Sequence, residues 1–122
     1  MNSEDIFMTG TSLTFLSMIY YFKTYKQKKP ILILKDNTDK MLSDNIFDYI
    51  FDVRTKEEYD RGNYKDAIHF HIANINKKNL ENYNKNKNYL LYCRSGRRAK
   101  VAADTMKANG FQNVYYINYM LN

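Results

Sequence analysis

The stretch Tyr89–Asn109 constrains the fold more than any other part of this 122-residue sequence. It opens with the run YLLYC, which is the pattern of a buried strand and ends at Cys93. A short turn with one glycine follows, and Arg97–Asn109 has the composition of a helix that Gly110 would end. The sequence therefore predicts a strand, a tight loop and a helix in direct succession, with a thiol at the end of the strand.

The loop after this strand is strongly basic. Cys93 is the only cysteine, and Arg94, Arg97 and Arg98 follow it closely. Fixed positive charge beside a thiol favours the thiolate, and the start of a helix adds unpaired N–H groups and a partial positive charge. We interpret the loop as a site for chemistry on sulfur; the alternative is an inert buried thiol.

The rest of the chain alternates between strand-like and helix-like segments. Strands are predicted at Ile31–Leu34, Phe47–Val53, Ala67–Ile72, Tyr89–Cys93 and Val114–Ile117. Helices are predicted at Asp36–Leu42, Lys56–Asp60, Asn74–Tyr83 and Arg97–Asn109, with Thr55 capping the second and Gly62 ending it. This alternation predicts an α/β fold with a mostly parallel five-stranded sheet, in which ligands bind at the carboxyl ends of the strands. Cys93 would lie at that edge.

Composition limits the class of protein. The length suits one folded domain, and a single cysteine excludes an internal disulfide and a multi-cysteine zinc site, which fits a reducing compartment. The net charge is +6, but the excess is divided between Lys23–Lys29 and the loop after Cys93. It does not form one nucleic-acid-binding stripe, so nucleic acid is not an expected partner.

The N-terminal segment Ile6–Phe22 carries no charged residue and sits at the lower length limit for a membrane span. Tyr20 and Tyr21 stand where an interfacial aromatic belt would lie, and lysines follow at once. We therefore expect a membrane-anchor helix with its basic linker over residues 1–29, and a folded domain over residues 30–122 on the cytoplasmic side. The alternatives are a short helix packed on the folded domain and, with less support, a cleaved signal peptide. Whether the lysines contact anionic lipid or only set the topology stays open.

Two motifs resemble those of the rhodanese domain. Asp52-Val53-Arg54, Glu58-Tyr59, Gly62 and Ala67-Ile68 are similar to its DVR-x-x-x-E-Y-x-x-G-H-I-x-G-A-I signature. The run Cys93–Ala99 resembles its active-site loop C-R-S-G-x-R-[SA], and Gly110–Val114 its helix-to-last-strand join. The resemblance covers about Ile31–Ile117 and implies three layers, a central five-stranded sheet flanked by helices, here preceded by the hydrophobic helix.

The resemblance implies a sulfurtransferase without a cofactor or metal. Cys93 would accept a sulfane sulfur as a persulfide from an anionic donor, such as thiosulfate or a persulfide. It would pass that sulfur to cyanide, a thiol or a protein acceptor. The expected substrate-binding residues are those of the loop, which are Arg94, Ser95, Gly96, Arg97 and Arg98. The backbone N–H groups of residues 94–98 would form an anion-binding nest around the sulfur.

Asp52, Arg54 and Glu58 are expected to support the site structurally. Arg54 and Glu58 are four residues apart, which is the spacing of an ion pair on a helix surface. His69 and His71 share one face of a strand, but no third ligand is evident, so ordinary strand positions are the better interpretation.

The sequence departs from the family in places. Asn63 and Asp66 replace a histidine and a glycine of the signature. The paired glycines after the last strand are replaced by Asn118 and Tyr119, and the final helix of a typical member is not evident, which predicts poor cover for one side of the sheet.

Three functions compete on this evidence. The first is the sulfurtransferase. The second is a phosphatase or arsenate reductase of related fold. The active-site loop of such enzymes resembles the pattern Cys-x5-Arg, but Ala99 stands at the arginine's position here, which argues against this function. The third is a non-catalytic, membrane-tethered interaction module, which the presence of Cys93 argues against.

Overall fold

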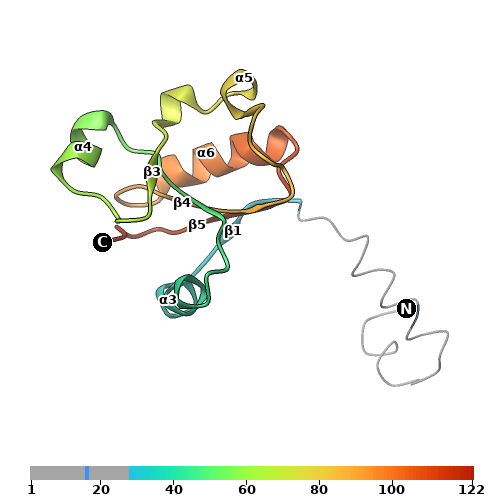
Figure 1. Ribbon diagram of the computed structural model, residues 1–122, viewed down its shortest axis with the longest axis horizontal. Helices are drawn as coiled ribbons and strands as arrows, with labels where there is room; N and C mark the ends of the chain where they lie inside the picture. Colours follow the sequence, from blue (N-terminus) through green and yellow to red (C-terminus); the bar gives the residue numbers. More distant parts are fainter. Residues whose placement is uncertain (1–15, 17–27) are drawn as a thin grey trace.

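A computed structural model describes Leu16 and residues 28–122, and its five strands form one parallel sheet (Figure 1). The order across the sheet is β1-β5-β4-β2-β3, and every neighbouring pair is parallel. The strands are β1 (Ile31–Leu32), β2 (Tyr49–Asp52), β3 (Ile68–His69), β4 (Asn88–Tyr92) and β5 (Asn113–Tyr116). The predicted α/β fold with a five-stranded parallel sheet is confirmed.

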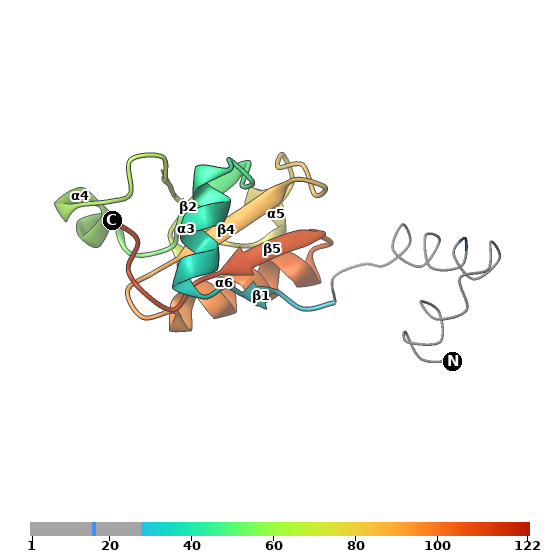
Figure 2. The same ribbon diagram turned by 90° about the horizontal axis from the view of Figure 1, so that it is seen from below.

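Helices lie on both faces of this sheet (Figures 1 and 2). They are α3 (Lys35–Ser43), α4 (Lys56–Arg61), α5 (Lys77–Leu80) and α6 (Arg97–Ala108), with a 3-10 helix η1 at Ile72–Asn74. α3 covers one face, while α5 and α6 lie on the other. The domain therefore has the three layers that the sequence predicts.

The core centres on β4, whose residues Tyr89–Tyr92 are all fully buried. Successive side chains of a strand point to opposite faces, so this one strand supplies both layers of the core. Tyr89 and Leu91 pack toward α6, and Leu90 and Tyr92 pack toward α3. A continuous apolar run is what a central strand buried on both faces requires.

Small residues let α6 pack closely on the sheet. Ala99, Ala102 and Ala103 are fully buried, as is Met106, at the spacing of one helix face. The first turn of α6 is thereby held directly over the end of β4, which is where the loop containing Cys93 begins.

The face of the sheet that carries α3 is also covered by the chain segment after β5. Leu121 is 5% exposed and belongs to the same cluster as Ile33, Leu90 and Ile117. The chain segment after β5 therefore covers part of this face of the sheet, although the sequence predicts poor cover for one side.

The outer strands are shorter than predicted. A strand does lie within the predicted range Ile31–Leu34, but β1 spans two residues. Ile31 and Leu32 are 45% and 40% exposed, so the strand is not buried as its apolar run indicates. This strand has a neighbour on one side only, β5, and α3 begins already at Lys35. β3 also ends early, at His69, because the chain turns into η1.

The predicted helix over Asn74–Tyr83 is reduced to a single turn, Lys77–Leu80. Asn76 caps it by accepting a hydrogen bond from the Asn79 N–H at 2.9 Å, and the Asn79 amide donates to the Asn74 carbonyl at 2.8 Å. Asparagine side chains that bond to nearby backbone compete with helix formation, which explains the short element.

The predicted anchor, Ile6–Phe22, lies outside the described residues except for Leu16, as do residues 23–27 of the linker. Within the part of the chain that is described, no helix has both the length and the hydropathy needed to cross a bilayer.

Candidate active site

Cys93 lies where the sequence predicts it, directly after β4 at the carboxyl edge of the sheet. Its Sγ accepts hydrogen bonds from the backbone N–H of Gly96 at 3.1 Å and of Ala99 at 3.4 Å. The second donor belongs to the first turn of α6, so the sulfur faces unpaired N–H groups at a helix start. Such a set of donors stabilises negative charge on sulfur. Cys93 is also 1% exposed, so the thiol is buried.

Gly96 gives the loop its shape. Its φ of +98° lies in the region that favours glycine, and it directly precedes α6. A Cβ at this position would stand 2.6 Å from the Asn118 Cα and 3.1 Å from the Ile117 carbonyl oxygen. Glycine therefore lets the loop turn beneath Cys93 while the segment after β5 packs against it.

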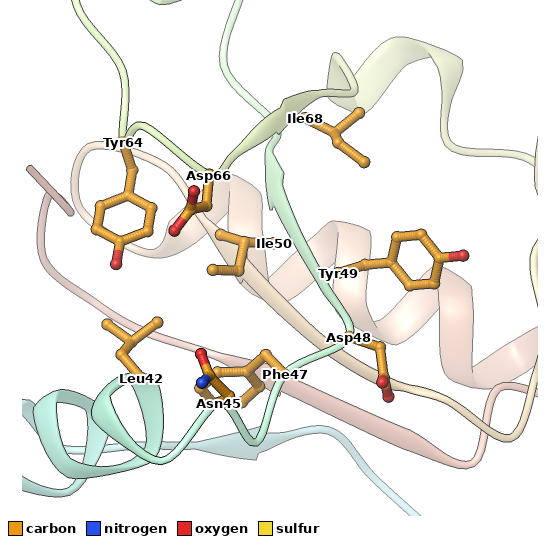
Figure 3. Close-up of a pocket in the computed structure, with 9 residues that line it drawn as sticks. All are labelled: Leu42, Asn45, Phe47, Asp48, Tyr49, Ile50, Tyr64, Asp66 and Ile68. Carbon is orange, nitrogen blue, oxygen red and sulfur yellow. The ribbon is translucent and has the colours of Figure 1, made fainter.

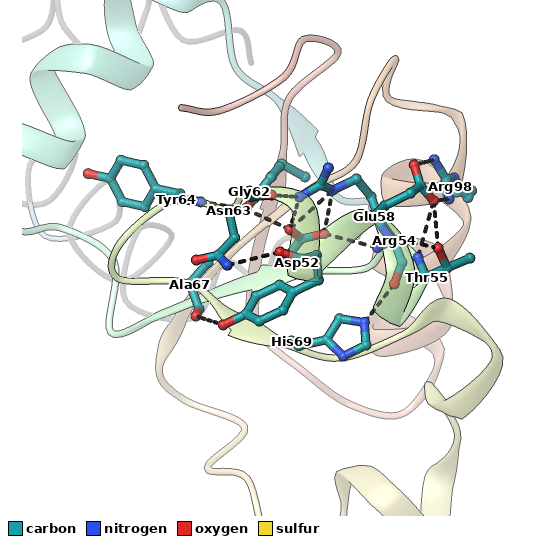
Figure 4. Close-up of polar contacts among 12 residues, drawn as sticks. Asp52, Arg54, Thr55, Glu58, Gly62, Asn63, Tyr64, Ala67, His69 and Arg98 are labelled. Atoms are coloured by element: carbon teal, nitrogen blue, oxygen red, sulfur yellow. Dashed lines mark hydrogen bonds and ion pairs between the residues drawn. The ribbon is translucent and has the colours of Figure 1, made fainter.

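The remaining loop residues differ in exposure. Arg94, Ser95 and Arg97 are exposed, whereas Arg98 is half-buried. The Arg98 guanidinium donates to the two Glu58 carboxylate oxygens at 2.6 and 3.1 Å, as a bidentate pair (Figure 4). The hydrogen bonds to Glu58 raise the pKa of Arg98.

Glu58 is held by the start of its own helix. Its Oε1 accepts from the Thr55 N–H at 3.2 Å, and the Thr55 Oγ1 accepts from the Glu58 N–H at 3.3 Å, which is a capping box. The predicted Thr55 cap is thus confirmed. The Arg98 hydrogen bond lowers the pKa of Glu58 to about 2, with further lowering by Thr55, while burial acts in the opposite direction.

The predicted ion pair between Arg54 and Glu58 is wrong. Arg54 precedes the cap residue Thr55, so the two side chains do not share a helix face. The Arg54 guanidinium instead donates to Asp52, with Nη2 at 2.6 Å from Oδ2, and to the Gly62 carbonyl at 2.7 Å (Figure 4). Asp52 raises the pKa of Arg54.

The Asp52–Arg54 pair is buried, and Asp52 accepts a further hydrogen bond from outside the pair. Tyr92 donates its hydroxyl hydrogen to Asp52 Oδ2 at 2.8 Å and accepts from the Tyr64 N–H at 3.1 Å. Burial raises the pKa of Tyr92 above the normal tyrosine range. These bonds join β2, β4 and the turn before β3, which is the supporting role expected of Asp52 and Arg54. The sequence analysis did not single out Tyr92. A tyrosine that precedes Cys93 in an apolar strand is explained equally well by simple burial in the core.

His69 and His71 extend the same edge. The His69 Nε2 lies 2.8 Å from the Arg54 carbonyl oxygen, and its ring packs on Tyr59 with centroids 4.8 Å apart. Among residues 28–122 no group of three or more metal-ligating side chains comes together.

Among the cavities in the described part of the chain, two adjoin the elements around β2. One, of about 240 Å³, lies between α3, β2 and the turn before β3, and Figure 3 shows Asp48 and Asp66 among its lining residues. No residue of the Cys93 loop lines it. The other, of about 370 Å³, is lined by Glu58, Arg61, Asn63 and Met120 among others, so it shares Glu58 with the pair beside Cys93.

The comparison with known families decides the assignment. The model of the rhodanese-like domain matches residues 34–119. The chain belongs to the rhodanese-like domain family. The match includes both predicted motifs, the one that begins at Asp52 and the one that begins at Cys93.

Individual relatives of this rhodanese-like chain differ in function. It is 38% identical over 65 residues to the "Putative sulfur carrier protein YrkF" of Bacillus subtilis (strain 168), covering 53% of the chain and 35% of the relative. It is 31% identical over 96 residues to a tRNA uridine(34) hydroxylase of Buchnera aphidicola, covering 75% of the chain and 30% of that protein. The chain thus spans about a third of the length of these curated relatives.

Solved structures share the rhodanese-like fold. A rhodanese-like domain protein from Staphylococcus aureus superposes with a TM-score of 0.59 at 29% identity, covering 75% of this chain and 84% of the other. The family match shows a rhodanese-like domain, and the reaction of this chain is argued below.

Proposed function

We propose that this protein is a sulfurtransferase that carries a sulfane sulfur as a persulfide on Cys93. The observation that carries the proposal is the sulfur's position, at the start of α6 with two backbone N–H groups donating to it. In the loading step the Cys93 thiolate attacks the outer sulfur of the donor, forming a new S–S bond as the bond to the leaving group breaks. With thiosulfate the leaving group is sulfite; with a persulfide R–S–SH it is the thiolate R–S⁻.

The second step returns the thiolate. A thiol or cyanide attacks the outer sulfur of the Cys93 persulfide and takes it away, so no redox partner is needed. A relative named as a sulfur carrier supports a protein thiol as one acceptor class. The exposed Arg94, Ser95 and Arg97 supply the surface that a donor or acceptor meets first.

The burial of Cys93 adds a requirement. Because the residue is 1% exposed, a donor reaches Sγ only after the atoms that cover it are displaced. The persulfide formed there would accept hydrogen bonds from the same backbone N–H groups, those of Gly96 and Ala99.

The decisive test uses the full chain in detergent and the Cys93→Ser variant. Incubation with thiosulfate or glutathione persulfide should add the mass of one sulfur atom to the wild-type protein, and cyanide should remove it as thiocyanate. Cys93→Ser should fold normally and gain no sulfur, because it has no thiol. Sulfur loading in the Cys93→Ser variant would contradict the assignment of Cys93 as the sulfur carrier. A folded wild type that neither loads sulfur nor reacts with iodoacetamide at Cys93 would leave a non-catalytic interaction module as the better account.

We also propose that Ile6–Phe22 anchors the protein in a membrane with residues 30–122 on the cytoplasmic side. The support is the uncharged run, which includes Tyr20 and Tyr21 near its end, and the four lysines that follow it before Pro30. Full-length protein should pellet with membranes and a variant lacking residues 1–22 should not. Full-length protein in the supernatant after ultracentrifugation would contradict the anchor.

A further inference from the structure

Charge around the thiol is more balanced than the number of arginines suggests. Arg98 directly precedes Ala99, whose N–H donates to the Cys93 Sγ at 3.4 Å, so Arg98 belongs to the turn that holds the sulfur. Glu58 binds that guanidinium through both carboxylate oxygens, at 2.6 and 3.1 Å. One negative charge thereby stands against one positive charge beside Cys93.

Glu58 is fixed in this position. Besides Arg98, its Oε1 accepts from the Thr55 N–H at 3.2 Å and lies 3.1 Å from the Thr55 hydroxyl. A carboxylate that is bound from two directions does not move away when an anion arrives. With its pKa at about 2, Glu58 also stays ionised throughout the neutral range.

The other two arginines of the loop are exposed. Arg94 and Arg97 lie in solvent, where water and salt weaken the attraction between their charges and a bound anion. The net electrostatic attraction for a doubly charged donor is therefore smaller than three arginines would provide.

We propose that Glu58 is a specificity-determining residue, which makes this site favour an organic persulfide, whose reacting end carries one negative charge, over thiosulfate as the sulfur donor. The inference rests on the proposed sulfurtransferase function. A persulfide R–S–S⁻ carries one charge on its reacting end and thiosulfate carries two, so the fixed carboxylate repels thiosulfate more strongly.

The test compares donors in three forms of the full chain: wild type, Glu58→Gln and Glu57→Gln. Glutamine keeps an oxygen for Thr55 and Arg98 but removes the charge. Glu57 lies in the same first turn of α4, is exposed, and serves as the matched control for loss of one carboxylate. Rapid quenching and mass spectrometry would give the second-order rate constant of Cys93 persulfide formation from thiosulfate and from glutathione persulfide.

We expect wild type to load faster from glutathione persulfide. Glu58→Gln should raise the thiosulfate constant about tenfold, the size that removal of one unit charge near a partly exposed site produces, and leave the persulfide constant within about twofold. Glu57→Gln should change neither. A merely structural loss would lower both constants together and leave their ratio unchanged, so an unchanged ratio in Glu58→Gln, or the same change in Glu57→Gln, would overturn the inference. A wild type that loads from neither donor would instead overturn the proposed function.

Discussion

At the scale of the residue, Gly96 is the position where the backbone allows least choice. Its φ is positive, and a side-chain Cβ at this position would stand 2.6 Å from the Asn118 Cα, so both the backbone conformation and the available space favour glycine. Glycine here does two things, since it allows the turn into α6 and leaves room for the segment after β5.

Gly96→Ala should therefore lower the free energy of unfolding by about 2–4 kcal/mol, the sum of about 1 kcal/mol for the left-handed conformation and a larger cost of overpacking. Urea unfolding at neutral pH measures it. Gly110→Ala is the matched control, because Gly110 has a similar φ of +91° but its Cβ would meet only the flexible Lys85 side chain, at 3.4 Å. We expect the control to lose about 1 kcal/mol. Equal losses in the two variants would show that the contact with Asn118 costs nothing.

Residue identities predicted part of the site. The strand-loop-helix pattern around Cys93 is local, so sequence alone placed the thiol at the sheet edge. The partners of Arg54 and Glu58 were not predictable from spacing, because Arg54 lies outside the helix that Glu58 begins. Glu58 pairs with Arg98, 40 residues away, and only the tertiary fold brings them together.

At the scale of the element, the Glu58–Arg98 pair ties the first turn of α4 to the first turn of α6. Both side chains are partly exposed, at 26% and 33%, so solvent weakens the pair. Its carboxylate nevertheless has a pKa of about 2 against an ordinary value of 4.5.

This difference predicts a pH dependence of stability. A lowered pKa in the folded state stabilises the protein above about pH 4.5, and that stabilisation is lost as the pH falls toward 2. Unfolding free energies from urea titrations across this range should fall less steeply for Glu58→Gln than for wild type. Glu57→Gln should follow the wild-type slope. Parallel slopes for all three proteins would mean that the pair contributes nothing to stability.

Element predictions succeeded where packing and local signals agree. β4 and α6 are buried, strongly patterned segments, and their predicted positions are correct to about one residue. α5 is shorter than predicted because asparagine side chains bond to the nearby backbone, and the hydrophobic periodicity of the sequence carries no information about these bonds. The exposure of β1 follows from its place in the strand order, which no local pattern encodes.

At the scale of the whole molecule, the sheet is covered unequally by helices. α5 and α6 lie on one face, and α3 shares the other with the segment after β5. Residue Leu121 therefore contributes to a core that the sequence pattern did not show, because a single leucine near the last residue has no periodicity.

Leu121→Ala should lower the free energy of unfolding by about 2 kcal/mol, the lower end of the range for leucine truncation in a core, since the surrounding segment is irregular and adjusts in part. Thermal or urea unfolding measures the change. The same truncation at Leu34, which is 65% exposed, provides the control and should cost less than about 0.5 kcal/mol. A loss at Leu121 no larger than that at Leu34 would show that the end of the chain does not cover the sheet in solution.

The two-residue outer strands, β1 and β3, have a consequence for crowding. A long unpaired strand presents a row of free N–H and C=O groups on which a neighbouring molecule can add its own strand. Here each rim of the sheet offers only two residues, Ile31–Leu32 and Ile68–His69. Copies at high concentration therefore have little template for pairing strands edge to edge.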